Sequence, residues 1–301
     1  MKKIFLICLL AMVLALAGCN NKEKIKVLTP SGAPALAQIF LQENQDRYLT
    51  DIVNGPDALV AGFGAANYDF IIAPINLGAK LYNNNIDYQL IAGVTFGNFY
   101  LATVTDWEFN LEFLEGKEVI CFGQNAVSDI VLQYVLLESG IDVDITYVDS
   151  LTSANAMLLA DNSKIILSAE PALSVLKNNI VGLKTIDIQE EYLSITENDY
   201  FPQAAVFAKK SLSSRLVSSF LKDLEISIVK VNDDLEATAA LATELEYGFL
   251  ESVLISAIPK SNIDFVLAKD MKEDVISFLD IIMDLNPALI GNKLPDEDFY
   301  R

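Results

Sequence analysis

Short apolar runs rich in β-branched and aromatic residues alternate along most of the chain with stretches whose apolar positions recur at helical spacing. The short runs fit buried strands, and the stretches between them fit amphipathic helices. Strands are predicted at 25–29, 69–73, 87–94, 100–105, 117–122, 144–148, 164–167 and 206–208. Helices are predicted at 34–42, 77–82, 128–139, 151–160 and 171–178. This alternation predicts an α/β fold with mostly parallel sheets that are covered on both faces.

The alternation stops near Leu212, and the segment 212–285 is predicted to consist of helices that follow one another without strands. Apolar residues recur there three or four positions apart, for example at Leu216, Phe220 and Leu224. Such stripes are typical of the core-facing side of an amphipathic helix. The sequence therefore predicts a helical C-terminal segment that closes an otherwise alternating fold.

The first apolar stretch, at 4–17, has a different character. It follows two lysines, is too short for the roughly 20 residues of a membrane-spanning helix, and ends in small residues before a polar run. An ordinary signal peptide and a short membrane anchor are both compatible with this pattern. However, residues 16–19 (Leu-Ala-Gly-Cys) resemble the lipobox of bacterial lipoproteins, in which the cysteine is lipidated and becomes the first mature residue. We therefore expect a signal peptide at 1–18 and a lipidated tether at 19–24, starting at Cys19, that holds the body on the extracytoplasmic face of a bacterial cell membrane.

The size and charge of the chain narrow the classes of function. Roughly 280 mature residues suit two lobes of about 100–150 residues each. The 21 basic and 41 acidic residues give a net charge of −20. This balance argues against a nucleic-acid-binding protein and against a polybasic membrane binder, because both need clustered positive charge.

The residue types that most often carry catalysis are scarce. The sequence has no histidine, which removes the usual general base and the commonest metal ligand. The mature chain also lacks the HExxH, GxSxG, Walker A and CxxC motifs. Its one remaining internal thiol, Cys121, lies in an apolar run and is expected to be a buried structural cysteine. We therefore expect no enzyme activity, no cofactor and no metal site.

Four of the predicted strands end in polar loops that lead into helices. In open α/β sheets, ligands bind beyond the carboxyl ends of strands, where helix starts present free N–H groups. Each loop also has a structural explanation, since Ser31 and Ser128 fit helix N-caps and Glu170 would balance a helix dipole. Together they indicate a site for a polar ligand. The loops are 30–34, 74–76, 123–128 and 168–171.

Several short motifs have the order found in one transport family. These motifs lie at 26–34, 68–74, 114–117, 169–172 and 290–296. They resemble the substrate-binding lipoproteins of ABC transporters, in the nitrate/sulfonate/taurine and thiamine-pyrimidine-precursor group, over nearly the whole mature chain. The resemblance implies a two-lobed type II periplasmic-binding-protein fold, in which two crossing strands join the lobes and a cleft between them holds the ligand.

Matched onto this chain, the resemblance places the crossings near 100–105 and 203–208. Lobe one would then hold 25–102 and 206–301, and lobe two would hold 103–205, with closure about the crossings. Phe96 would either stack on a planar ligand or pack at the start of a crossing strand. The implied ligand contacts are Ser31, Gly32, Ala33, Asn76, Phe96, Gly97, Asn98, Gln124, Asn125, Ala126 and Glu170.

The four loops contain no lysine or arginine, which a nitrate or sulfonate site would be expected to use. This favours a neutral or cationic organic ligand, such as a pyrimidine-like heterocycle, with Glu170 as acceptor and Phe96 as platform. The expected function is a monomeric solute receptor that delivers this ligand to an ABC permease and its ATPase. An enzyme on the same fold and a ligand-sensing lipoprotein that feeds a signalling partner are the alternatives.

Overall fold

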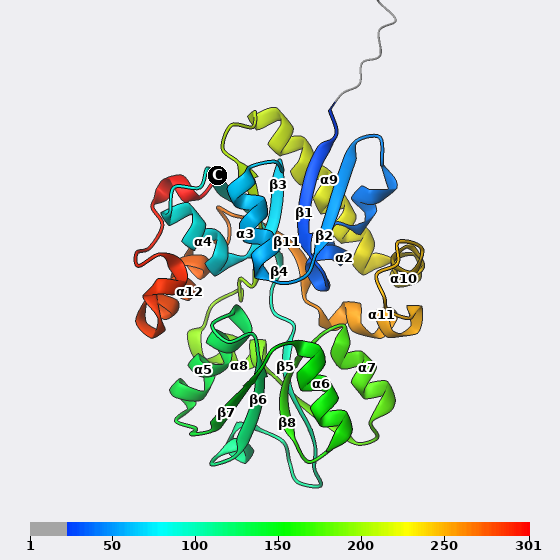
Figure 1. The fold of residues 1–301 in the computed structure, drawn as a ribbon, viewed down its shortest axis with the longest axis vertical. Coiled ribbons are helices and arrows are strands. Elements are labelled where there is room, and N and C mark those ends of the chain that lie inside the picture. Colours follow the sequence, from blue (N-terminus) through cyan, green and yellow to red (C-terminus); the bar gives the residue numbers. More distant parts are fainter. Residues whose placement is uncertain (1–22) are drawn as a thin grey trace, which may run out of the picture.

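The computed structural model describes residues 23–301, so the predicted signal peptide and Cys19 lie outside the described residues. The described chain forms two α/β lobes stacked end to end, each built around one sheet (Figure 1). The strand order is β11-β4-β10-β3-β1-β2 in the first sheet and β7-β6-β8-β5-β9 in the second. These features confirm the predicted α/β fold.

The first lobe holds the six strands β1 (Ile25–Pro30), β2 (Tyr48–Val53), β3 (Phe70–Pro74), β4 (Tyr88–Thr95), β10 (Ala204–Lys209) and β11 (Ile263–Leu267). Its helices are α2 (Ala33–Ala37), α3 (Pro56–Ala65), α4 (Ile75–Asn83), α9 (Ser214–Asp233), α10 (Leu235–Glu244), α11 (Glu251–Ala257) and α12 (Lys272–Leu285). Short 3₁₀ turns occur at η1 (Ile39–Glu43), η3 (Ile258–Lys260), η4 (Pro287–Ile290) and η5 (Glu297–Phe299).

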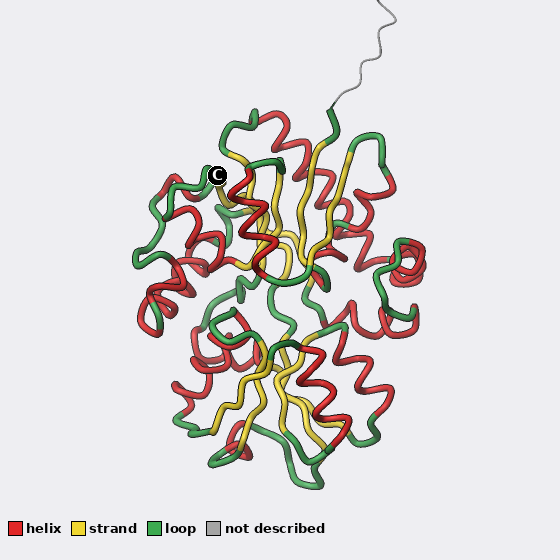
Figure 2. The backbone as a smooth tube through the Cα atoms, viewed as in Figure 1, coloured by secondary structure: helices red, strands yellow, loops and turns green. Residues whose placement is uncertain are grey.

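The second lobe holds the five strands β5 (Phe99–Val104), β6 (Glu118–Phe122), β7 (Asp144–Val148), β8 (Ile165–Ala169) and β9 (Leu183–Asp187). Its helices are α5 (Val127–Ser139), α6 (Leu151–Ala160), α7 (Ala172–Asn179) and α8 (Ile188–Thr196), with a 3₁₀ turn at η2 (Leu111–Leu114). Helices flank the strands in both lobes (Figure 2). None of the helices within 23–301 has the length and apolarity that crossing a membrane requires.

The expectation of mostly parallel sheets is wrong. Among residues 23–301, four strand pairs are parallel and five are antiparallel. Four of the five antiparallel pairs, those made by β5 and β10, follow from the connection between the lobes. Strands β5 and β10 each begin at the junction between the lobes, whereas their neighbours β8, β3 and β4 end there, so the returning strands run in the opposite direction.

The chain passes between the two sheets at 96–98 and again at 197–203. Strand β5 pairs with β8 and β9 in the second sheet, starting at Phe99, and β10 pairs in the first sheet from Ala204 onward. The lobe ranges expected from sequence, 25–102 with 206–301 and 103–205, stay a prediction. The pairing favours a boundary a few residues earlier at each crossing.

Strand β3 shows how the sequence produces the layers. Its consecutive apolar residues alternate between two cores, because successive side chains of a strand point to opposite faces. Phe70 and Ile72 pack with the apolar face of α9, and Ile71 and Ala73 pack in the core on the α3 and α4 side. A strand buried on both faces reads as a continuous apolar run, as this segment does.

The helical stripe predicted after Leu212 is confirmed in α9. Ser213 caps this helix, since its hydroxyl accepts a hydrogen bond from the Leu216 N–H, and Phe220 and Leu224 are fully buried. The prediction that 212–285 contains no strand is wrong, because β11 lies within it. Strands β2 and β9 and helices α3 and α8 were not predicted from the sequence either.

Candidate functional site

The carboxyl ends of β1, β3, β6 and β8 all meet the junction between the lobes (Figure 1). Each is followed by one of the polar loops singled out in the sequence. The geometry therefore brings these four loops, two from each lobe, to one region of the molecule. The predicted contacts differ in how they are held there.

The 31–33 loop presents backbone rather than a side-chain cap. The N-cap of α2 is Gly32, at φ 90°, so the interpretation of Ser31 as N-cap is wrong. The exposed Ser31 hydroxyl instead donates to Asn54 Oδ1 at 2.7 Å, and Ala33 is buried as the first helical residue. Ser128 is likewise not the cap of α5. Both helix starts therefore keep backbone N–H groups free of side-chain caps.

Asn98 links the two crossings and the second lobe. Its side chain is 4% exposed; Nδ2 donates to the Glu170 carbonyl oxygen at 2.8 Å, and Oδ1 accepts from Gln203 Nε2 at 2.9 Å. One buried amide thus joins the crossing at 96–98 to the crossing at 197–203 and to the end of β8. Gln203 was not among the predicted ligand contacts. Its position directly before the strand of the second crossing, which could be read from the sequence, would have indicated that it lies at the lobe junction.

The backbone of Glu170 contacts Asn98 at the junction, while its carboxylate accepts a hydrogen bond from the start of α7. Oε2 accepts from the Ser174 N–H at 3.0 Å, and Oε1 has no hydrogen-bond partner within the described chain. Burial raises the pKa of this carboxyl above its usual range, an effect that the bonds from Ser174 and the charges of Lys177 and Lys260 partly offset. The side chain therefore acts as an acceptor at a helix start, and one of its oxygens remains available.

We expect Glu170→Gln to change how stability depends on pH. A raised carboxyl pKa stabilises the folded state below the unfolded value, about 4.3, and this contribution is lost as pH rises through the folded pKa. Glutamine keeps the acceptor for Ser174 and removes the buried charge. The variant should gain unfolding free energy at pH 8 and little at pH 4, in urea titrations. Equal effects at both pH values, or the same gain from the exposed Glu190→Gln, would contradict this.

The exposed loop at 124–126 is shaped by a buried carboxylate that sequence analysis missed. Asp129 is 1% exposed, and its Oδ2 accepts from the Asn125 N–H at 2.7 Å. Its Oδ1 accepts from Gln133 Nε2 and from the Tyr147 hydroxyl, both at 2.8 Å. These bonds hold Asn125 at φ 63° and keep the three predicted contacts of this loop at the surface. Asp129 is therefore a positioning residue for the loop.

Phe96 packs within the protein. Its ring is 8% exposed, lies against Gly93, where a Cβ would fall 2.6 Å from Cζ, and is tilted onto Tyr200 with ring centroids 5.1 Å apart. This arrangement favours the packing interpretation over the stacking platform. Asn76, in the first turn of α4, is 8% exposed and is, after Asn98, the second buried side-chain amide among the predicted contacts.

A cavity of about 560 Å³ lies behind Phe96, lined by residues of both lobes and of the second crossing. Of the predicted ligand contacts, all of which are in the described chain, only Phe96 lines it. Its walls carry four carboxylates, at Asp187, Glu190, Asp199 and Asp264, several apolar side chains and, among the described residues, no lysine or arginine. The cavity is therefore suited to neutral or cationic molecules, although it lies apart from most of the predicted contacts.

No protein-family model matches the sequence, and no curated protein sequence matches it. Solved structures do match. An ABC transporter from Parabacteroides distasonis is similar with a TM-score of 0.81 and 23% identity, over 92% of this chain and 98% of that one. The periplasmic aliphatic sulphonate binding protein of Escherichia coli has a TM-score of 0.71 and 11% identity, over 91% and 92%.

The ligand-binding component of an ABC-type import system from Staphylococcus aureus, with zinc bound, has a TM-score of 0.71 and 15% identity, over 93% of this chain and 97% of that one. These similarities extend over both lobes and both crossings. The identities are low, so they establish architecture and not ligand. The chain has the two-lobed fold of the periplasmic substrate-binding proteins of ABC importers, as its motif order predicts.

Proposed function

We propose that this protein is a lipid-anchored solute receptor that captures a small organic ligand between its lobes and delivers it to an ABC importer. The observation that carries the proposal is the junction itself. Four helix-starting loops converge there from two lobes, and Asn98 connects both crossings with the second lobe. A ligand bound between the lobes would contact residues whose own contacts depend on how the two lobes are arranged.

The similarity to solved substrate-binding proteins supports this function, because it covers more than nine tenths of the chain in the three structures compared. The permease and ATPase that the receptor would serve are separate proteins. The absence of histidine supports a receptor over an enzyme on the same fold. A sensing lipoprotein would use the same ligand site and would differ only in its partner.

The membrane anchor can be tested separately from the ligand. Cys19→Ser should move the protein from the membrane fraction to the soluble fraction, because each buried acyl CH₂ contributes about 0.8 kcal/mol to membrane binding. The matched control is Cys121→Ser, which alters a buried thiol in β6 and should leave the protein in the membrane fraction. Fractionation with immunoblotting checks this. Retention of the Cys19→Ser variant on the membrane would contradict the lipid anchor.

For the ligand, we propose a neutral or cationic organic molecule, with an aminopyrimidine-like heterocycle preferred over nitrate or a sulfonate. The proposed contacts remain the eleven residues from Ser31 to Glu170. They offer amide, hydroxyl, carboxylate and backbone groups, and none is a lysine or an arginine. The nearby cavity, with its four carboxylates, also favours positive over negative ligands.

A thermal-shift screen of the purified full chain tests the ligand class. Aminopyrimidines and related heterocyclic amines form one arm, and alkanesulfonates and nitrate form the other. A ligand at 100 times its Kd should stabilise the protein by about 2.7 kcal/mol. Stabilisation by the first arm alone is expected. Stabilisation by sulfonates or nitrate alone would overturn the ligand class and leave the receptor function standing.

A further inference from the structure

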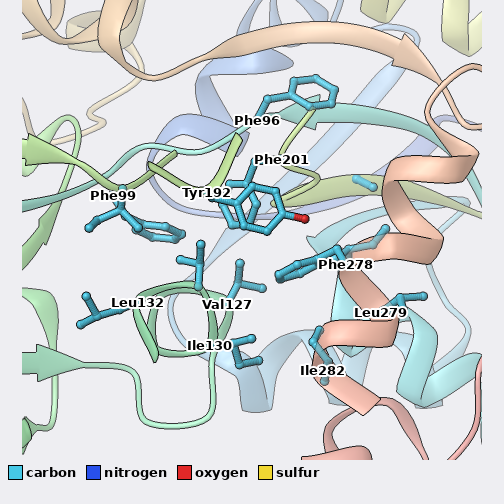
Figure 3. Close-up of a cluster of buried hydrophobic side chains, with 14 of the residues drawn as sticks. Phe96, Phe99, Val127, Ile130, Leu132, Tyr192, Phe201, Phe278, Leu279 and Ile282 are labelled. Atoms are coloured by element: carbon cyan, nitrogen blue, oxygen red, sulfur yellow. The ribbon is translucent and has the colours of Figure 1, made fainter. Parts of the chain in front are cut away.

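Helix α12 connects the hydrophobic cores of the two lobes. It follows β11 in the first lobe, and its apolar face packs onto α5 and α8 of the second lobe (Figure 3). The ring centroid of Phe278 lies 5.2 Å from that of Phe201, in the second crossing, and 6.0 Å from that of Tyr192, in α8. All three side chains are fully buried. The seam made by α5, α8 and α12 is therefore a continuous core and not a contact of two surfaces.

Hydrogen bonds attach the second crossing to the same helix. Asp274 Oδ1, at the start of α12, accepts from the N–H groups of Asp199 at 3.0 Å and Tyr200 at 3.3 Å. Asn198 Nδ2 donates to Ser277 Oγ at 3.1 Å. Three consecutive residues of the crossing are thus bound to α12, which leaves little of this segment free to bend.

The other flank of the junction is built differently. The core around α9 lies wholly in the first lobe, and the core between the second sheet and helices α6 and α7 lies wholly in the second. On this flank α7 and α11 lie in direct contact across the junction, and the hydroxyl of the buried Tyr100, in β5, donates to the Lys260 carbonyl oxygen, in η3, at 2.9 Å. Among residues 23–301, no hydrophobic cluster spans the lobes on this flank, whereas the α12 seam belongs to one buried core shared by both lobes. Opening the α7/α11 flank therefore exposes less apolar surface than opening the seam, so the two flanks are unequal.

We propose that α12 is the pivot of lobe movement: the α5/α8/α12 seam stays packed while the junction opens on the α7/α11 flank. This restricts the lobes to rotation about one edge, instead of a symmetric opening about two free crossings. Ligand would enter and leave on the α7/α11 side. The entry side rests on the proposed function, because it presupposes a ligand. The packing of the seam does not depend on any ligand.

Hydrogen exchange with mass spectrometry on the full chain tests the pivot without a ligand, so its result is independent of the proposed function. Amides of α5, α8 and α12 should exchange at least tenfold more slowly than those of α7 and α11. Phe278→Ala should speed exchange in α5 and α8, on the other lobe, at least tenfold. If that variant does not fold, Phe278→Leu provides the milder change.

The matched control is Phe220→Ala, which removes an equally buried ring from the core of the first lobe alone. It should speed exchange in α9 and leave α5 and α8 within twofold of the unchanged protein. The proposal is overturned if α7 and α11 are as protected as the seam. It is also overturned if the Phe278 and Phe220 variants affect α5 and α8 equally.

Discussion

Gly97→Ala is expected to lower the free energy of unfolding by roughly 3 kcal/mol, the largest effect of any single-methyl change in the crossings. Gly97 has φ +99°, which a side chain strains, and an added Cβ would fall 2.0 Å from Gln189 Cγ and 2.8 Å from Phe201 Cδ1. Gln189 cannot easily move, because its Oε1 accepts from the Phe99 N–H at 2.7 Å. Urea unfolding followed by circular dichroism measures the loss.

The control separates backbone strain from the clash. Gly140, which ends α5, has φ +67° and no atom within 4 Å of an added Cβ. Gly140→Ala should therefore cost only about 1 kcal/mol, from the conformation alone. Equal losses for the two variants would mean that the crossing tolerates a side chain at Gly97 and is looser than its packing indicates.

Asn98→Ala should cost about 2–4 kcal/mol in unfolding free energy, because it removes two hydrogen bonds at once. The Glu170 carbonyl oxygen would lose its donor and the Gln203 amide its acceptor, with both groups close to the lobe junction. The same variant should weaken binding of any ligand found in the thermal-shift screen at least tenfold, since the side-chain link between the two crossings and the end of β8 would be lost. Urea unfolding and isothermal titration measure the two effects.

An exposed asparagine provides the comparison. Asn84 Nδ2 also donates to a backbone carbonyl, that of Lys80 at 2.9 Å, but at the solvent-exposed end of α4. Asn84→Ala should change stability by less than about 0.5 kcal/mol and leave ligand binding unaltered. A loss of stability at Asn98 without any loss of affinity would confine Asn98 to a structural role.

Most of the strands that could be predicted lie inside their sheets, where apolar runs are buried on both faces: β1, β3, β4, β5, β6, β8 and β10. The exception is β7, an edge strand that was predicted although it is only partly buried. The missed strands β2, β9 and β11 lie at sheet edges, where only part of each strand is buried and no such run is needed. In addition, β11 is flanked by helices on both sides, which hid it within a helical segment.

The candidate site was predictable in place but not in detail. Strand-helix loops can be read from the sequence, and they converge at the junction as the α/β pattern requires. The pairing of Asn98 with Gln203 joins residues 105 positions apart, which local patterns do not reveal. The same limit applies to two other side chains. From the sequence, Glu170 fits either a helix start or a ligand acceptor, and Phe96 fits either core packing or a stacking platform. The seam formed by α12 depends on tertiary packing alone.

Native mass spectrometry of the full chain, purified without denaturation and then incubated, tests the central claim most directly. A receptor should carry one small organic molecule per chain, and the molecule should be recovered with unchanged mass after incubation and release. The Asn98→Ala variant, prepared in parallel, should carry less of it. Recovery of the molecule in chemically altered form would contradict a receptor and indicate an enzyme on this fold.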